Sequence, residues 1–282
     1  MLCLPKVQKH NEDPGVMMIS KKISLFDMDG TLTKPRERIQ ADMIQALSDL
    51  SKFSEVGIVS GSDLPLIKEQ VVQYLLEDLK KSMILFPCNG TQAYNFIDNT
   101  YQKVYSTNMI SEIGKNEFFD LFKFLLKQQK VTCDDNPDIL INGNFIENRG
   151  SMLNYCIPGR SSSSAERKRF EFIDFTRSIR EHILTRIKAY ISRKKISLSA
   201  SIGGKTSIDI YPKGWDKTYV MNHLNDYDPI TFVGDKCDGT GNDKELYNLQ
   251  DHADNLICFK TSSPEETIDI IYQRILPMMS KV

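Results

Sequence analysis

The chain has 282 residues, of which 40% are apolar, so two domains with packed cores are the first expectation. Its 36 basic and 37 acidic residues are balanced, which gives no electrostatic case for nucleic acid or a membrane as a partner. No apolar run approaches a membrane span or a signal-peptide core. The six cysteines are scattered without a C-x-x-C pair, which argues against a zinc site and a disulfide framework and predicts a cytoplasmic protein.

The first 18 residues are mixed polar and contain the turn signal Asp13-Pro14-Gly15, so we expect a flexible N-terminal extension. The apolar run Ile23 to Phe26 then predicts a buried strand, which ends on Asp27 and Asp29. Ligands bind at the carboxyl ends of strands in open α/β sheets. One carboxylate can attack phosphorus and the other can move a proton, so the stretch indicates phosphoryl transfer. An acidic turn after a strand is the alternative interpretation.

Two further strands precede possible ligand-binding loops. Val56 to Val59 ends in Ser60-Gly61-Ser62-Asp63, where Ser60 or Ser62 would bind phosphate at a helix N-terminus, or Ser62 or Asp63 would only cap the helix. Met83 to Phe86 ends in Cys88-Asn89-Gly90, where Asn89 would contact substrate or belong to a hairpin turn. Strands and helices alternate with short connections, which predicts a doubly wound α/β core formed by residues 19–107 and 215–282.

The pattern changes over residues 108–214, which predict an inserted α+β cap domain. A helix is expected over Glu117 to Gln129, and a long helical stretch around Glu166 to Ile191. Ile208 and Ile210 alternate with polar residues, so inward-facing isoleucines would place Ser207, Asp209 and Tyr211 together on the opposite face.

The chain returns to the core at Trp215-Asp216-Lys217, where Asp216 would cap a helix and Lys217 would be exposed or would offset nearby anions. The strand Ile230 to Val233 ends in a second acid, Asp235, and a glycine-containing loop brings Asn242 and Asp243 back towards it. Carboxylates and carbonyls are the hard oxygen ligands that Mg²⁺ prefers, so a magnesium site is predicted here. A flexible acidic loop is the alternative.

Several segments together identify a family resemblance. The segment Phe26-Asp27-Met28-Asp29-Gly30-Thr31-Leu32-Thr33 resembles the first motif of the haloacid dehalogenase (HAD) superfamily, and Lys34-Pro35-Arg36 continues it as in the eukaryotic phosphomannomutases. The cap segments Glu147-Asn148-Arg149, Pro158-Gly159-Arg160, Glu166-Arg167 and Ser207-Ile208-Asp209-Ile210 are similar to that family in the same order. Single arginines are most often solvated, but a cluster of them suits a phosphorylated substrate.

The resemblance implies a HAD-like core and the interconversion of mannose 6-phosphate and mannose 1-phosphate, with glucose phosphates as further substrates, in the supply of GDP-mannose. It implies Mg²⁺, a hexose 1,6-bisphosphate activator and an aspartyl phosphate. The catalytic residues would be Asp27, Asp29 and Lys217. The substrate would be held by Arg36, Ser60, Ser62, Asn89, Arg149, Arg160, Arg167, Ser207 and Asp209. The metal would be held by Asp27, Asp29, Asp235, Asn242 and Asp243.

A sugar-phosphate phosphatase on the same scaffold is the alternative enzyme, because both chemistries use Asp27 and Asp29. A catalytically silent relative would be expected to lack some of the acids and Lys217, which are all present. The chain departs from the family pattern at Cys88, where glutamate is usual, and at Thr240, where glycine is usual. The resemblance also implies a homodimer through the cap helix that carries Phe118, Phe119, Phe122 and Leu126, unless these side chains pack on the cap sheet.

Overall fold

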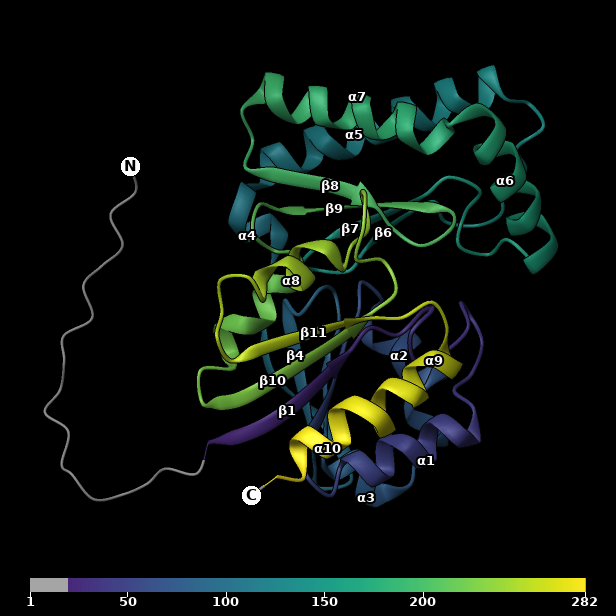
Figure 1. Cartoon of the computed structure of the whole chain (residues 1–282). Helices are drawn as coiled ribbons and strands as arrows, with labels where there is room; N and C mark the ends of the chain where they lie inside the picture. Colours follow the sequence, from purple (N-terminus) through teal and green to yellow (C-terminus); the bar gives the residue numbers. More distant parts are fainter. Residues whose placement is uncertain (1–19, 282) are drawn as a thin grey trace, which may run out of the picture.

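The computed structural model describes residues 20–281, and the predicted N-terminal extension, residues 1–18, lies outside them. Two sheets are arranged one above the other, each packed against helices (Figure 1). The N-terminal and C-terminal thirds of the described chain form the lower part, and the middle of the chain forms the upper part. Among residues 20–281, the helices are too short or too polar to span a bilayer.

The lower sheet confirms the predicted doubly wound α/β core. Its strands run in the order β11 (Leu256–Lys260), β10 (Tyr227–Gly234), β1 (Lys21–Phe26), β2 (Glu55–Val59), β3 (Met83–Phe86), β4 (Gln92–Ile97), β5 (Thr100–Ser106). Neighbours from β11 to β3 pair in parallel, whereas β3, β4 and β5 pair antiparallel. The chain therefore visits the centre of the sheet first and then its two edges, which leaves the carboxyl ends of β1 and β10 adjacent.

The β4–β5 hairpin was not predicted from the sequence. Its turn residues Asp98 and Asn99 both have positive φ angles, 49° and 60°, as a tight hairpin turn requires. Strand β5 lies at the edge of the sheet and exposes most of its side chains, so it lacks the continuous apolar run that marked the central strands. The Asp-Asn pair was therefore the available signal for this element.

Helices cover both faces of the core sheet, because alternate strand residues point to opposite sides. Phe26 of β1 packs with the helices α1 (Ala41–Leu50), α2 (Leu64–Gln70) and α3 (Glu77–Lys81) and the C-terminal segments α9 (Pro264–Ile270), η3 (Ile271–Ile275) and α10 (Leu276–Met279). Leu25 packs on the other side with Val220 of the 3-10 helix η2 (Lys217–His223) and Leu246 of α8 (Lys244–Leu249). A short 3-10 turn, η1 (Val72–Tyr74), follows α2.

The upper sheet has the strand order β6 (Ile146–Asn148), β7 (Leu153–Cys156), β9 (Ser207–Pro212), β8 (Leu198–Ile202), and all its pairs are antiparallel. We call it the cap sheet. Its outer face is covered by α5 (Lys115–Asp135) and α7 (Ile179–Lys194), while α4 (Met109–Ile113) and α6 (Ser164–Arg177) lie beside its two ends (Figure 1). Ile208 and Ile210 pack under these helices, so Ser207, Asp209 and Tyr211 lie on the face that looks towards the core.

The long helix predicted around Glu166 to Ile191 is two helices, which corrects that expectation. Ser178, between α6 and α7, has a φ of 51°, in the left-handed region that ends a helix. The Asp174 carboxylate accepts hydrogen bonds from the backbone amide and the Nε of Arg180, both at 2.7 Å, and fixes the bend. The isoleucines spaced four apart, at 179, 183, 187 and 191, all lie in α7, so their periodicity marks that helix and carries no signal for the break before it.

Candidate active site

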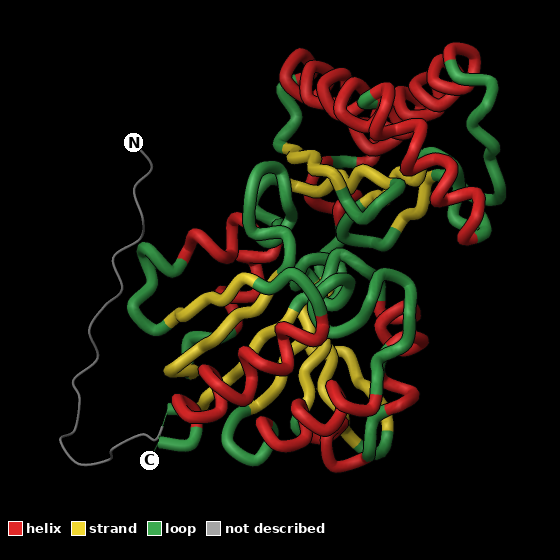
Figure 2. Tube along the Cα trace, turned by 45° about the vertical axis from the view of Figure 1, so that its right-hand side comes forward, coloured by secondary structure: helices red, strands yellow, loops and turns green. Residues whose placement is uncertain are grey.

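A cleft of about 700 Å³ lies between the core and the cap sheet. Figure 2 shows the loops at the ends of the core strands facing the cap strands across this region. The core lines the cleft with acids, two serines and the basic residues Lys34, Arg36 and Lys236, and the cap lines it mainly with basic side chains and hydroxyls. The predicted site residues on its walls are Asp27, Asp29, Arg36, Ser60, Ser62, Arg149, Arg160, Arg167, Ser207, Asp209, Asp235 and Asn242.

Three acids converge at the floor of the cleft because β1 and β10 are parallel neighbours. The Asp27 amide donates to the carbonyl of Val233 at 2.9 Å, which places Asp27 beside the end of β10. Carboxylate oxygens of Asp27, Asp235 and Asp243 all lie within 4.8 Å of one another. The Asp235 Oδ1 is buried and accepts no hydrogen bond from residues 20–281. An orphaned carboxylate oxygen beside two other acids fits a hard divalent cation such as Mg²⁺.

Lys217 is fully buried and forms ion pairs with Asp27 and Asp243. The predicted cap is present, because Asp216 accepts a hydrogen bond from the Thr218 amide at 3.0 Å, but the exposed-lysine alternative is wrong. Burial raises the pKa of Asp27 to about 7, and the Lys217 ammonium opposes that rise. Burial acts to lower the pKa of Lys217, yet Asp243 and Asp27 together raise it above its usual value. The lysine is therefore held charged among the acids.

The loop between β10 and α8 returns Asp243 to the floor, where its Oδ2 accepts from the Lys236 amide at 3.0 Å. Gly241 passes so close to the Lys236 carbonyl that a Cβ there would overlap it. Thr240 stands where the family usually has glycine, but its φ is not positive, so this departure brings no backbone strain. Asn242 faces the cleft, and Asp243 is fully buried beside Lys217.

Asp29 lies at the cleft wall, one turn beyond Asp27. Its Oδ1 accepts a hydrogen bond from the Arg36 amide at 3.0 Å, so the segment after β1 folds back over the site. Gly30 has a φ of 99°, and a Cβ there would collide with the Asp235 carboxylate. The glycine thus allows the two acid-bearing strand ends to approach each other.

The loop after β2 presents both candidate serines to the cleft. Ser60 accepts on its Oγ from the Ser62 amide at 3.1 Å, and Asp63 caps α2 by accepting from the Leu66 amide at 3.2 Å. Asn89 is buried behind this loop and does not line the cleft, unlike the substrate-contacting position predicted for it. Its backbone amide donates to the Ser60 carbonyl at 2.8 Å. Its Oδ1 has no hydrogen-bond donor among residues 20–281.

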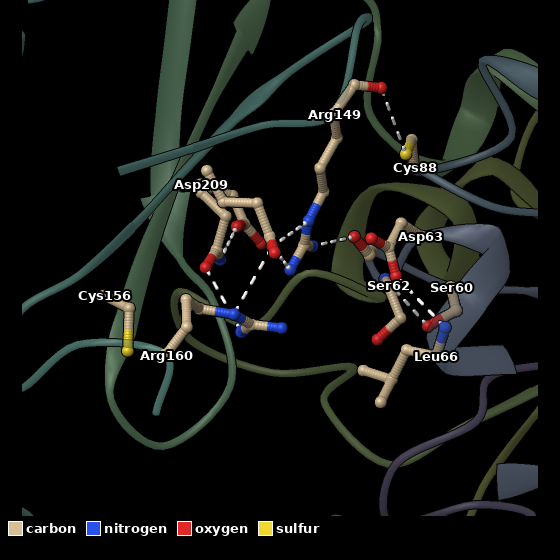
Figure 3. A network of polar contacts seen from close by, with 12 residues as sticks. Ser60, Ser62, Asp63, Leu66, Cys88, Arg149, Cys156, Arg160 and Asp209 are labelled. Atoms are coloured by element: carbon tan, nitrogen blue, oxygen red, sulfur yellow. Dashed lines mark hydrogen bonds and ion pairs between the residues drawn. The ribbon is translucent and has the colours of Figure 1, made fainter. Parts of the chain in front are cut away.

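Arg149 crosses from the cap to the core (Figure 3). Its Nε donates to Glu147 at 2.8 Å, and its Nη1 donates to the carbonyl of Gly61 at 2.6 Å. Burial acts to lower the pKa of Arg149, but Asp209 and Glu147 raise it above its usual value. Asp209 is itself buried and accepts from the Asn154 amide group at 2.6 Å. The arginine is therefore neutralised by cap acids and anchored on the loop after β2.

Arg160 is held more loosely. Its Nε lies 3.4 Å from the Glu147 carboxylate, and its Nη1 lies 3.4 Å from the side-chain Oδ1 of Asn154. Burial and the neighbouring Arg149 lower the pKa of Arg160. Burial, Arg160 and Arg167 likewise lower the pKa of Arg36. These guanidinium groups repel one another across the cleft, which is the environment that an anionic ligand relieves.

Arg167 lines the same cleft, but its donors are used within the cap. Its Nε donates to the Ser162 carbonyl at 3.0 Å and its Nη1 to the Thr206 hydroxyl at 2.9 Å. Its Nη2 donates to the carbonyls of Arg160 at 2.8 Å and Gly159 at 3.3 Å. The guanidinium thereby ties the loop that carries Arg160 to the β8–β9 turn.

Three polar residues of the site, Glu147, Asn154 and Lys236, were not predicted from the sequence. Glu147 balances Arg149 and Arg160, and Asn154 positions Asp209. Lys236 has its pKa pulled down by burial but raised overall by Asp27 and Asp235. Glu147 stands in the segment quoted above for Arg149, and the adjacency of Lys236 to Asp235 was a usable signal.

A family model described as eukaryotic phosphomannomutase matches residues 43–277. A phosphomannomutase of Dendrobium officinale is 36% identical over 247 residues, which cover 88% of this chain and 91% of that protein. One from Arabidopsis thaliana is 34% identical over 255 residues, with 90% and 94% covered. Among solved structures, an IMP-bound, N-terminally truncated IMP-nucleotidase of Plasmodium falciparum superposes with a TM-score of 0.63 at 13% identity, covering 90% of this chain and 68% of that one. A trehalose-6-phosphate phosphatase related protein gives a TM-score of 0.52 at 16% identity, covering 92% of this chain and 100% of that one. These two share the fold, and the chain belongs to the eukaryotic phosphomannomutase family.

Proposed function

We propose that the protein is a magnesium-dependent phosphomannomutase that interconverts mannose 6-phosphate and mannose 1-phosphate in the supply of GDP-mannose. The observation that carries this proposal is the division of charge in the cleft. Asp27, Lys217 and Asp235 form a phosphoryl-transfer site on the core, and Arg36 and Arg160 form a separate cationic region. A substrate with a phosphate at each end fits both regions, whereas simple phosphate hydrolysis needs only the first.

In the proposed reaction, Asp27 carries a phosphoryl group that a hexose 1,6-bisphosphate activator first supplies. Asp29 takes the proton from a free hydroxyl of the hexose monophosphate, the hydroxyl oxygen bonds to phosphorus, and the bond to the Asp27 oxygen breaks. The resulting bisphosphate reorients. The Asp27 carboxylate then attacks the other phosphorus, and Asp29 returns the proton to the departing sugar oxygen.

Asp27, the backbone carbonyl of Asp29 and Asp235 would hold the magnesium ion, with Asn242 and Asp243 in or near its shell. The buried, unpartnered Oδ1 of Asp235 supports this assignment. The ion would supply a positive charge that neutralises the transferring phosphoryl group. Lys217, which is ion-paired with Asp27, would contribute a second positive charge, and Ser60 or Ser62 would donate a hydrogen bond to the phosphate.

The cap would act as a separate domain, residues 108–214, that closes over the substrate and excludes water from the aspartyl phosphate. Ser207 and Asp209 would contact the sugar from the cap sheet. We also propose a cytoplasmic homodimer. The cysteines within residues 20–281 are free thiols, as suits a reducing compartment, and Phe119 and Leu126 on α5 are exposed by 49% and 45%.

A phosphate-balance assay tests the proposal. Mannose 1-phosphate, Mg²⁺ and a hexose 1,6-bisphosphate are supplied, and mannose 6-phosphate and free phosphate are measured together. A mutase forms the isomer with little free phosphate. Stoichiometric free phosphate without isomer contradicts the proposal and supports a HAD-type sugar-phosphate phosphatase.

A further inference from the structure

Three segments meet where the cap sheet rests on the core. They are the loop after β2 (residues 60–63), the loop between β3 and β4 (residues 87–91) and the turn between β6 and β7 (residues 149–152). The first belongs to the phosphate-binding end of the cleft, and the third carries Arg149. The second segment touches both of the others and lies behind the cleft wall.

The backbone of the loop between β3 and β4 forms hydrogen bonds with the backbone of the loop after β2. The Cys88 amide donates to the Ser62 carbonyl at 2.9 Å, and the Asn89 amide donates to the Ser60 carbonyl at 2.8 Å. Both donors have positive φ angles, 52° for Cys88 and 62° for Asn89, so the loop holds an unusual conformation to make these contacts. Cys88 is 1% exposed, and burial raises its thiol pKa to about 12, so the residue is neutral at this junction.

Thr91 and Gln92, which follow directly in the chain, form hydrogen bonds with the turn that carries Arg149. The Gln92 side chain, at the start of β4, donates from Nε2 to the backbone carbonyl of Arg149 at 3.0 Å. Tyr94 donates to the Gln92 Oε1 at 3.1 Å, which fixes the orientation of the amide. The hydroxyls of Thr91 and Ser151 hydrogen-bond at 2.6 Å, so the turn is attached at a second point.

Arg149 connects the turn between β6 and β7 to the loop after β2, so all three segments are linked by hydrogen bonds. Its backbone is held by Gln92, and its guanidinium donates to the carbonyl of Gly61, between the two serines that the β3–β4 loop already holds. A shift of the turn would move the guanidinium away from Gly61 and Glu147 together. The position of Arg149 in the cleft therefore depends on the side-chain amide of Gln92, a residue that does not itself line the cleft.

We propose that Gln92 is a positioning residue of the phosphomannomutase reaction, which acts by fixing the Arg149 main chain so that its guanidinium enters the cleft between Gly61 and Glu147. This inference rests on the proposed function and on the substrate contact that the family resemblance implies for Arg149, which lines the cleft between core and cap. It assigns a core side chain to the control of a cap arginine. The position of the bound substrate would then depend on the core residues at the start of β4 as well as on the cap.

The test uses Gln92→Met, which keeps the side-chain length and removes the amide donor. The expected result is a roughly 3- to 10-fold loss of kcat/KM for hexose phosphate conversion, the effect of one neutral hydrogen bond. Hydrolysis of a small aryl phosphate should be unchanged, because it needs only the core acids and the metal. In an Arg149→Ala background, Gln92→Met should cause no further loss, since its effect passes through that arginine.

Gln102→Met is the matched control, because the Gln102 amide also donates to a backbone carbonyl, that of Ile97, but on the exposed β5 edge. It should leave both activities unchanged. Gln92→Glu is a second variant that keeps the acceptor for Tyr94 but cannot donate to Arg149, and it should lose at least as much kcat/KM as Gln92→Met.

Three results would overturn the inference: full hexose phosphate activity in both Gln92 variants, an equal loss with aryl phosphate, or losses that add to that of Arg149→Ala. An equal loss with both substrates would assign Gln92 a structural role. Failure of the proposed function is recognised separately, because wild-type protein would then release phosphate from mannose 1-phosphate without forming the isomer.

Discussion

Replacing Arg160 should separate substrate binding from protein stability. Its guanidinium is held by two contacts of 3.4 Å and faces other arginines, so little protein structure depends on it. In the proposed enzyme it holds the phosphate that is not being transferred, through a charge-assisted hydrogen bond. Losing one such contact costs about 2–3 kcal/mol, so Arg160→Ala should lower kcat/KM for hexose phosphate conversion roughly 30- to 150-fold. Both kcat and affinity should fall, because this phosphate contributes binding energy to cap closure.

The free energy of unfolding should change much less than in a typical buried truncation. Burial and Arg149 depress the pKa of Arg160, which shows that its charge is unfavourable in the ligand-free cleft. Arg160→Ala should therefore leave the free energy of unfolding in urea within about 0.5 kcal/mol of wild type. Arg160→Lys keeps a charge but loses the planar fork, so it should recover only part of the activity.

Arg167→Ala provides the contrast. It removes donors from the Ser162, Gly159 and Arg160 carbonyls and from Thr206, so it should lower the free energy of unfolding by about 1–3 kcal/mol. Its loss of hexose phosphate conversion should accompany displacement of the loop that carries Arg160. If Arg160→Ala slows aryl phosphate hydrolysis as much as hexose phosphate conversion, Arg160 supports the core site and the clamp assignment is wrong. If Arg167→Ala loses conversion with unchanged stability, Arg167 itself binds the substrate.

Asp27→Asn should abolish turnover while the protein still folds, because the amide is a poor nucleophile and Lys217 keeps its ion pair with Asp243; substantial turnover by a folded variant would refute the nucleophile assignment. Mg²⁺ should raise the melting temperature of the wild-type protein, because it binds the crowded acids of the native state, and Asp235→Asn should reduce that shift in calorimetry. An equal shift in both proteins would place the ion elsewhere. Phe119→Glu should convert the proposed dimer to a monomer in sedimentation, since Phe119 is exposed on α5 whereas Phe118 is 5% exposed in the cap core. A wild-type monomer at micromolar concentration would contradict this proposal.

The positions of the core acids could be predicted from the sequence because strand ends are marked by residue type. A short apolar run defines each central strand, and the first polar residue after it must lie at the carboxyl edge of a parallel sheet. Asp27 and Asp235 meet for this reason, although 208 positions separate them. The two-fold alternation of β9 likewise predicted that Ser207 and Asp209 would share the face opposite Ile208.

Residue type does not reveal contacts that are made with the main chain. Arg160 and Arg167 look alike in the sequence, and both stand in segments that resemble the family. The acceptors of Arg167 are mostly backbone carbonyls, which any residue supplies, so its commitment to the cap fold is visible only in three dimensions. The same holds for Gln92, whose partner is the Arg149 carbonyl. It also holds for the helix break at Ser178, where a side chain four residues earlier determines the bend.

The charges of the cleft also explain why one ligand would order the whole site. On the core, three carboxylates have two lysines, since Lys217 pairs with Asp27 and Asp243 and Lys236 lies 3.5 Å from Asp235, so one positive charge is missing there. Facing the cap, Arg36 and Arg160 have depressed pKa values, so an anion is missing there. A metal ion with the first phosphate corrects the balance at the core, and only a second phosphate corrects it at the cap. A ligand with one phosphate leaves the arginines repelling one another, which opposes closure of the cap. In the proposed reaction the cleft would therefore favour closure over a bisphosphate, the species that this mechanism must keep from water and from release between its two half-reactions.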